Sequence, residues 1–163
     1  MVAVSNRNDF VLAGLRIAVG CLFLIFAEYK VFGTRFTMGG GFLDWIHLFI
    51  KDGAYPFMVP VLQHFVLDHS TAIAFLVAYG ELAIGLALVL GVLVRVASFG
   101  GLIYMLTLLF SSNYPGPNAV LWQYFGASLT HLVFALCFTA FLFGNADVVW
   151  SLRTLTQARK LGR

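Results

Sequence analysis

Charged residues are scarce in this chain. They make up 10% of its 163 residues, whereas soluble domains carry about 25%. The ten basic and seven acidic residues leave a net charge of +3, and the basic residues form no dense run before the C-terminus. This excludes the basic surface of a nucleic-acid-binding protein. Because 61% of the residues are hydrophobic, the composition indicates a membrane protein.

Cysteine is also scarce, and the usual cofactor motifs are missing. The two cysteines, Cys21 and Cys137, lie in apolar runs and form no C-x-x-C pair, which excludes a disulfide framework and a thiol relay. The sequence has no dinucleotide fingerprint, cluster-binding cysteines or C-x-x-C-H haem motif. The histidines at 47, 64 and 69 do not follow a known metal-binding spacing. We therefore predict neither haem nor metal.

Long apolar runs dominate what is present. Four of them, at 10–32, 71–94, 96–112 and 121–143, are near the roughly 20 residues that a spanning helix needs. Little more than Arg95 separates the second run from the third, which predicts a tight helical hairpin. The pattern predicts one domain over 1–163, an all-α integral membrane four-helix bundle.

The positions of the basic residues predict the orientation. With both termini in the cytoplasm, most of them lie at the cytoplasmic face, as the positive-inside rule requires: Arg7, Arg95, Arg153, Arg159, Lys160 and Arg163. The tail at 146–163 is then cytoplasmic, and the segment at 33–70 lies outside the cell.

The segment at 33–70 contains an amphipathic pattern. Asp44 and His47 share one face of a helix over 42–50, and the opposite face is apolar, formed by Phe42, Trp45, Ile46 and Phe49. This pattern predicts a helix that lies along the membrane surface.

One carboxylate, Glu81, falls inside an apolar run. At about 1.5 Å of rise per residue, Glu81 and His131 lie at a similar depth in the membrane, with Tyr104 and Thr107 nearby and Arg16 about 10 Å lower. Glu81 shares its face with small residues, which favour helix contact: Ala74, Ala78 and Gly85, with Leu88. On the first helix we expect a similar stripe at Gly14, Ala18, Cys21, Ile25 and Glu28.

Two interpretations of Glu81 follow. A charged side chain in mid-membrane costs at least about 2.5–3.5 kcal/mol, so it pairs or binds a proton and marks a functional site by default. Arg16 or His131 is the expected partner of Glu81. Alternatively, Glu81 joins helices by hydrogen bonds to Tyr104 or Ser128. Glu28 and Lys30, near the end of a run, are expected to be interfacial anchors.

Three stretches carry a resemblance to a known family. LRIAVGCLFLIFAEYKVFG at 15–33 and AYGELAIGLALVLGVLVRVAS at 78–98 resemble the DoxX/DoxD family of small bacterial and archaeal membrane proteins. NYPGP, followed by WQYFGASLTHLVFALCF up to residue 138, is similar to the DoxD branch. Gly144 and Asn145 depart from the Gly-Arg that the family often has there, so no arginine role is expected at that point.

The resemblance implies a multi-pass protein of the bacterial or archaeal inner membrane. DoxD-like proteins serve as a subunit of thiosulfate:quinone oxidoreductase, which implies quinone as cofactor and other redox subunits as partners. Arg16, Glu81 and Arg95 match the polar positions of the family. We expect Glu81 and His131 to be catalytic, and Arg16, Tyr104, Thr107 and Ser128 to contact the cofactor, with Arg16 holding the carboxylate. The alternative is a non-catalytic assembly subunit.

Overall fold

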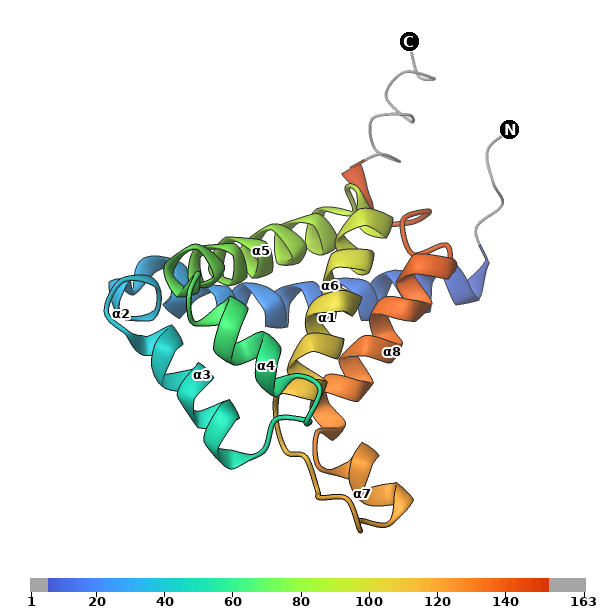
Figure 1. Ribbon diagram of the computed structural model, residues 1–163. Coiled ribbons are helices and arrows are strands. Elements are labelled where there is room, and N and C mark those ends of the chain that lie inside the picture. The colour runs from blue at the N-terminus through green and yellow to red at the C-terminus, as the bar shows by residue number, and fades with distance from the viewer. Residues whose placement is uncertain (1–5, 153–163) are drawn as a thin grey trace.

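The computed structural model describes residues 6–152, and this part of the chain is helical with no strand. Three helices are long and apolar enough to cross a membrane: α1 (Arg7–Phe32), α5 (Ser70–Leu90) and α6 (Val94–Ser111). A shorter apolar helix, α8 (Leu129–Phe143), completes the bundle (Figure 1). The predicted all-α membrane bundle is confirmed.

A capping box begins α1 one turn before its long apolar stretch. The Asn6 side chain accepts hydrogen bonds from the backbone N–H groups of Asn8 and Asp9, and the Asp9 carboxylate accepts one from Asn6 N at 2.9 Å. These bonds satisfy N–H groups that have no partner inside the helix. The helix therefore begins at Arg7, earlier than the predicted residue 10.

Helices α1 and α5 pack antiparallel along two seams spaced by three and four residues. The buried seam of α1 is Ala13, Arg16, Gly20, Phe23 and Ala27, and that of α5 is Ala74, Ala78, Glu81, Gly85 and Leu88. A methyl group added at Gly20 would lie 2.9 Å from Val89, and one added at Gly85 would lie 2.8 Å from Leu24. Small residues thus let the two backbones approach closely.

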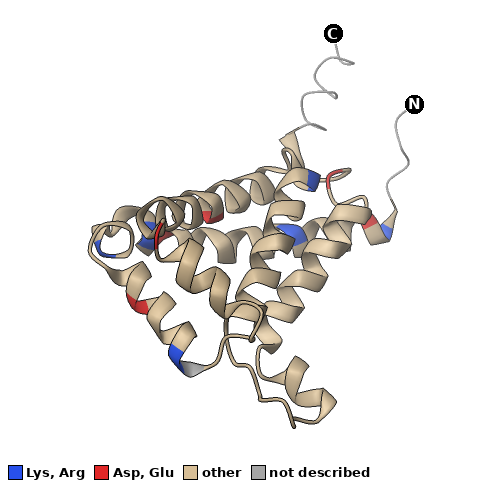
Figure 2. Cartoon of the chain, viewed as in Figure 1, with Lys and Arg blue, Asp and Glu red and all other residues tan. Residues whose placement is uncertain are grey.

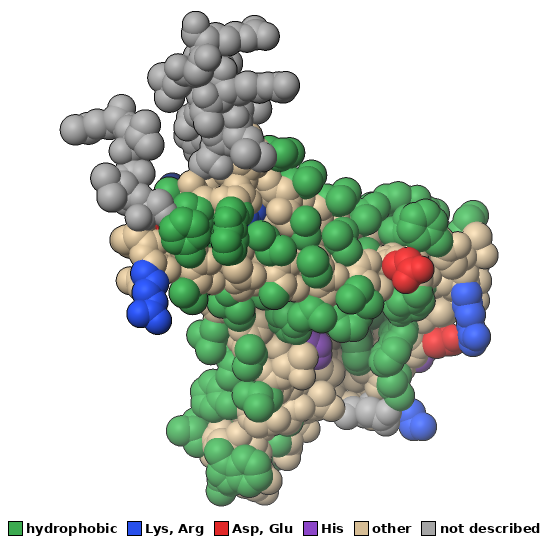
Figure 3. Space-filling view, turned by 180° about the vertical axis from the view of Figure 1, so that it is seen from behind, with side chains coloured by type: hydrophobic (Ala, Val, Ile, Leu, Met, Phe, Trp, Pro, Cys, Tyr) green, Lys and Arg blue, Asp and Glu red, His purple; other side chains and the backbone are tan. Residues whose placement is uncertain are grey.

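The predicted inward stripe on α5 is confirmed, but the one on α1 is wrong. Gly14 is half-buried, whereas Ala18, Cys21, Ile25 and Glu28 are exposed. They lie on the outer face of α1, because the α1 seam that meets α5 is about one-third of a turn away. Figure 3 shows hydrophobic side chains over much of the surface on that side of the molecule, as expected for contact with lipid.

A tight hairpin joins α5 to α6, and α6 pairs with α8. Gly91 (φ 68°) and Leu93 (φ 50°) turn the chain in the left-handed region, so α5 ends at Leu90, before the predicted residue 94. Arg95 therefore lies in the first turn of α6. Helix α6 packs against α8, where the Phe138 ring fills the space over Gly101.

The fourth predicted span is interrupted. The run at 121–143 begins and ends as predicted, but it forms α7 (Leu121–Gly126) and α8, with Ala127 and Ser128 between them. The Ser128 hydroxyl there accepts a hydrogen bond from Asn113 Nδ2 at 3.1 Å. Helix α8 alone rises about 22 Å, less than the roughly 30 Å hydrocarbon core, so a crossing of the membrane here requires α7 as well. That the run spans the membrane stays a prediction.

The segment between α1 and α5 folds against the bundle. It comprises α2 (Thr34–Thr37), α3 (Gly41–Asp52), α4 (Val59–Val61) and a π-helical turn, η1 (Leu62–Val66). The predicted helix over 42–50 is confirmed. Phe42 and Ile46 are buried against Leu62 and α5, whereas Trp45 on the same apolar side is 49% exposed. The apolar face of α3 thus packs on protein. The position of this helix along the membrane surface stays a prediction.

An aromatic cluster joins this segment to the far end of α6. The Tyr55 ring lies 5.4 Å from Phe110 and 4.9 Å from Tyr114, and Tyr55 N donates to Phe110 O at 3.0 Å. Tyr114 N donates in turn to Gly53 O at 2.7 Å. In Figure 1 the segment connects the end of the α1–α5 pair to the end of the α6–α8 pair.

Both ends of the described chain lie beside the α5–α6 hairpin. The Phe10 and Trp150 rings are 5.5 Å apart, and a methyl group added at Gly91 would meet Ser151. Figure 2 shows that charged positions are few and that many lie near the corners of the molecule. This arrangement agrees with termini on one side of the membrane. Which side is cytoplasmic stays a prediction.

Candidate functional site: a buried carboxylate between three helices

Glu81 lies on the inner seam of α5 and is 5% exposed. It separates two apolar clusters. Leu88, one turn beyond Gly85, belongs to the cluster of α1, α6 and α8, while Ala74 and Ala78 belong to the cluster around α3 and η1. The carboxylate is therefore a polar group inside an apolar interior, where its charge requires partners.

Lys30 is the ionic partner of Glu81. Its Nζ lies 2.5 Å from Oε1 and 2.6 Å from Oε2, with the side chains of Lys30 and Glu81 only 12% and 6% exposed. The ammonium also lies 5.3 Å from the centre of the Phe36 ring, within the range of a cation–π contact. Both carboxylate oxygens thus accept hydrogen bonds from one cation.

The predicted role of Lys30 as an interfacial anchor is wrong, because its ammonium is paired with Glu81. Helix α1 continues to Phe32, so Lys30 lies within its last turn. The spacing of Phe23, Ala27 and Lys30 continues the seam of α1 that faces α5. That spacing was the signal in the sequence that identifies Lys30 as inward-facing.

Tyr104 completes the site from α6. Its hydroxyl donates to Glu81 Oε1 at 2.5 Å, so the prediction that Glu81 points towards Tyr104 is confirmed. We name Lys30, Glu81 and Tyr104 the carboxylate cluster. It links α1, α5 and α6 between the two apolar clusters. Its hydrogen bonds are charge-assisted, and such a bond is about twice as strong as a neutral one.

Arg16 does not hold the carboxylate, and that prediction is wrong. It is fully buried near the hairpin, where Nη1 donates to Leu88 O at 2.5 Å and Nη2 to Trp150 O at 2.7 Å. Leu88 O is in the last turn of α5, where carbonyl groups lack a partner within the helix and the dipole favours a cation. Arg16 thus joins α1 to the end of α5 and to the chain after α8.

Helix length explains why Arg16 and Lys30 have separate roles. They lie on the same seam, fourteen positions apart, which is about 21 Å along the helix axis. Only one of them is level with Glu81. The register in which α1 packs on α5 places Arg16 beside the end of α5 and Lys30 beside Glu81.

The other predicted site residues have contacts elsewhere. Thr107 is exposed, and its hydroxyl donates to Ile103 O at 2.9 Å. Ser128 is buried but bonds Asn113, near the break before α8. On α8, His131 lies between Ser128, which bonds Asn113, and Phe138, which packs over Gly101. The structure brings neither Thr107 nor Ser128 into the carboxylate cluster.

His131 carries a buried polar atom. The residue is half-buried on α8, and within residues 6–152 its Nδ1 has no hydrogen-bond partner. Buried polar atoms are usually hydrogen-bonded, so an unpaired nitrogen calls for an explanation such as a bound group or water. In the same part of the chain, no three His, Cys, Asp or Glu side chains gather to hold a metal ion.

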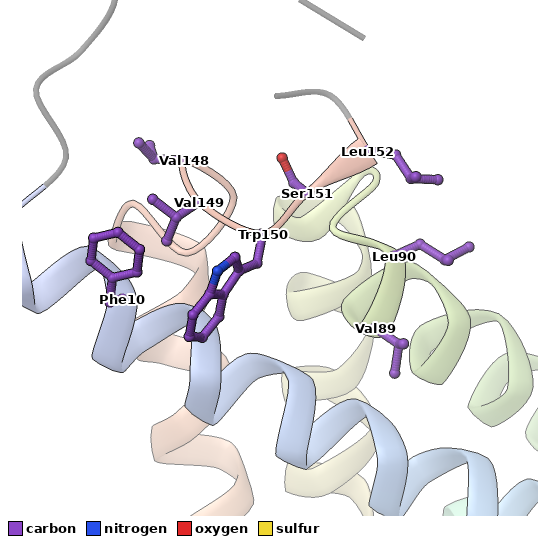
Figure 4. Close-up of a pocket in the computed structure, with 8 residues that line it drawn as sticks. All are labelled: Phe10, Val89, Leu90, Val148, Val149, Trp150, Ser151 and Leu152. Atoms are coloured by element: carbon purple, nitrogen blue, oxygen red, sulfur yellow. The ribbon is translucent and has the colours of Figure 1, made fainter. Parts of the chain in front are cut away.

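Two surface grooves lie at the other end of the bundle. One, of about 570 Å³, is lined by Phe10, Val89, Leu90, Val148, Val149, Trp150, Ser151 and Leu152 (Figure 4). A second, of about 550 Å³, lies around the hairpin and includes Arg95, Asp147 and Leu152. Lys30, Glu81 and Tyr104 line neither of these two grooves.

Comparison with known proteins gives the family. No curated protein and no solved structure matches the chain. Residues 11–113 match the DoxX family model, and this range contains the whole carboxylate cluster and Arg16 but neither α7 nor α8. The match covers more than half of the 163 residues, and the helical fold is that of a membrane protein. The chain therefore belongs to the DoxX family.

Proposed function

We propose that the chain is a membrane subunit of a quinone-linked oxidoreductase in which Glu81 exchanges a proton with the quinone head group. The observation that carries the proposal is a carboxylate, 5% exposed inside a membrane protein, that touches both a lysine and a tyrosine. Ionisable groups inside the membrane are usual sites of proton transfer. Lys30 and Tyr104 bear exchangeable protons, and the Glu81 carboxylate between them is able to accept one.

The chemistry of quinones fits such a cluster. Reduction of a quinone to a quinol takes up two electrons and two protons, and each carbonyl oxygen becomes a hydroxyl. When the Glu81 carboxylate takes up a proton, it donates to the Tyr104 oxygen, and the Tyr104 hydroxyl then turns to donate to one quinone carbonyl. Transfer of one proton along each of these two bonds protonates the carbonyl and restores the carboxylate. In this proposal His131, from α8, donates to the other carbonyl through its unpaired ring nitrogen.

Three residues lose the roles that the sequence predicted for them. Lys30 replaces Arg16 as the cation that holds the carboxylate. Thr107 and Ser128 have no part in it, because one is exposed and the other bonds Asn113. The proposed proton-handling residues are Glu81, Tyr104 and His131, with Lys30 positioning the carboxylate.

A partner must supply the electrons. The sequence contains no motif for a dinucleotide, an iron–sulfur cluster or haem. A second subunit therefore oxidises the donor, and the resemblance to the DoxD branch favours thiosulfate. Oxidation of two thiosulfate ions to tetrathionate releases two electrons, which balances the reduction of one quinone.

A second candidate is a non-catalytic assembly subunit. The observation in its favour is that both oxygens of Glu81 are already bonded, one of them to two donors, so the cluster ties three helices together. Under this reading the cluster stabilises the bundle, and another chain of the complex binds quinone.

Glu81→Gln separates the two candidates. Glutamine still accepts hydrogen bonds from Lys30 and Tyr104, but it does not titrate. We expect the thermal melt to stay cooperative but to move to a lower temperature, because Lys30 loses its anionic partner. Quinone reduction should fall by about 10²–10⁴-fold, measured on the purified complex with its partner subunits, and a folded variant that loses so much activity separates the two effects. Glu28→Gln is the matched control, because Glu28 is an exposed carboxylate on α1. If the complex carrying Glu81→Gln reduces quinone at the parent rate, proton transfer by Glu81 is refuted and the assembly role remains.

A further inference from the structure

Trp150 forms one wall of the first groove, at the hairpin end of the bundle. Trp150 has a φ of 49°, a left-handed conformation that is unusual for a bulky residue, and its carbonyl is held at 2.7 Å by the fully buried Arg16. The indole is 57% exposed. Backbone strain of this kind persists where the surroundings impose it, and it gathers at ligand sites.

The indole lies across α1 and borders the first groove, which we call the apolar channel. Its six-membered ring is 3.8 Å from a methyl group added at Gly14, and its edge meets the Phe10 ring. Figure 4 shows Phe10 and Trp150 on one side and Val89 and Leu90, from the end of α5, on the other. The channel of about 570 Å³ is thus lined almost entirely by hydrocarbon, apart from the indole N–H and Ser151.

A cation adjoins this channel. The second groove, of about 550 Å³, shares Leu152 with the first and contains Arg95 in its lining. Arg95 is exposed. Asp147 also lines this groove, but it lies close enough to the guanidinium of Arg16 to interact with it electrostatically, and that cation offsets its charge. An apolar channel next to an exposed arginine at the end of the membrane-spanning helices matches a molecule with an acyl chain and an anionic head.

We propose that this pair of grooves binds an anionic phospholipid of the surrounding bilayer. One acyl chain lies between Trp150 and the end of α5, the phosphate faces Arg95, and the indole N–H donates to the ester region of the lipid. Indole rings favour this depth of a membrane, because one edge is apolar and the other donates a hydrogen bond. The site is independent of the carboxylate cluster, which lies towards the other end of α5.

Quenching of Trp150 fluorescence tests the proposal. The full chain carrying Trp45→Phe and Trp122→Phe keeps Trp150 as its only tryptophan, and both replaced rings are exposed. The protein is placed in nanodiscs of phosphatidylcholine with increasing amounts of a brominated lipid, either phosphatidylglycerol or phosphatidylcholine. We expect brominated phosphatidylglycerol to quench at about fivefold lower mole fraction, the preference that one cation near the surface provides.

Two variants make the test specific. Arg95→Gln should remove the preference for phosphatidylglycerol, and Arg35→Gln, an exposed arginine on α2 at the other end, should keep it. Equal quenching by both lipids in the parent would overturn the proposal, and so would loss of the preference in Arg35→Gln. Trp150 that neither lipid quenches would show that the channel is closed to lipid, which also overturns it.

Discussion

Replacement of Lys30 by methionine should destabilise the bundle more than any other single change in the carboxylate cluster. The change keeps most of the side-chain volume but leaves the Glu81 carboxylate, 6% exposed, with only Tyr104 as partner. Removing one partner of a buried ion pair costs about 3–5 kcal/mol. A lone charge in mid-membrane costs about 2.5–3.5 kcal/mol on the insertion scale. We therefore expect the free energy of unfolding to fall by about 3 kcal/mol.

The double variant Lys30→Met with Glu81→Gln should recover most of this loss. Once the carboxylate is an amide, it no longer requires a cation, and Tyr104 still donates to it. We expect the pair to show a coupling energy of about 2–3 kcal/mol in a double-mutant cycle. The measurement is reversible unfolding in mixed micelles of a mild detergent and dodecyl sulfate, followed by the helical circular dichroism signal.

Arg16 provides the control for this cycle. Arg16→Met removes donors from Leu88 O and Trp150 O, so it should also destabilise the protein. Because Arg16 lies about 21 Å from Lys30 along α1, its effect should add to that of Glu81→Gln within about 0.5 kcal/mol. Additive effects of Lys30 and Glu81, or a strong coupling of Arg16 to Glu81, would refute the assignment of the ionic partner.

Two further predictions concern single contacts, and a third concerns the orientation in the membrane. Tyr104→Phe should lower the free energy of unfolding by about 1.5–3 kcal/mol because the removed hydroxyl bonds a carboxylate, whereas Thr107→Val, on an exposed face of the same helix, should have little effect; chemical unfolding compares them. Gly101→Ala should cost about 1–3 kcal/mol, since the added carbon would lie 2.3 Å from the fully buried Phe138 ring. Gly100→Ala, where the nearest atom to the added carbon is 3.9 Å away, should leave the free energy of unfolding unchanged. Thermal melting compares the two variants, and equal melting temperatures would contradict the packing described for α6 and α8. For the orientation, a cysteine at position 40 should react with an impermeant thiol reagent added outside intact cells and one at position 163 should not, and the reverse pattern would overturn the predicted sidedness.

Much of the fold follows from local properties of the sequence. Apolar runs of membrane length predict the helices whatever they pack against, because lipid leaves the backbone no other partner than itself. The face of α5 that carries Glu81 was also predictable, since Ala74, Ala78 and Gly85 repeat at the spacing of a helical contact seam. Tyr104 was also predictable as a partner, because it lies on the polar stripe of the next helix. The depth count placed Thr107 nearer to the level of Glu81, and that choice between the two was wrong.

The break between α7 and α8 was not predictable in this way. Nothing in the composition of 121–143 distinguishes Ala127 and Ser128 from the apolar residues around them strongly enough to end a helix. The break coincides with a tertiary contact, in which the preceding loop brings Asn113 to the Ser128 hydroxyl. Likewise, Trp45 faces outward because the register of α3 on α5 buries Phe42 and Ile46 instead.

The sequence by itself determined that a carboxylate lies within an apolar helix long enough to cross a membrane, and that a cation on the first helix is available to pair with it. Only the tertiary structure decided that the cation is Lys30 and not Arg16. Both lie on the same seam of α1, so periodicity does not distinguish them. The choice depends on how far α1 slides along α5, and close packing at Gly20 and Gly85 sets that distance. Depth counted along each helix separately carries no information about this offset, because it arises from the contact between the two helices.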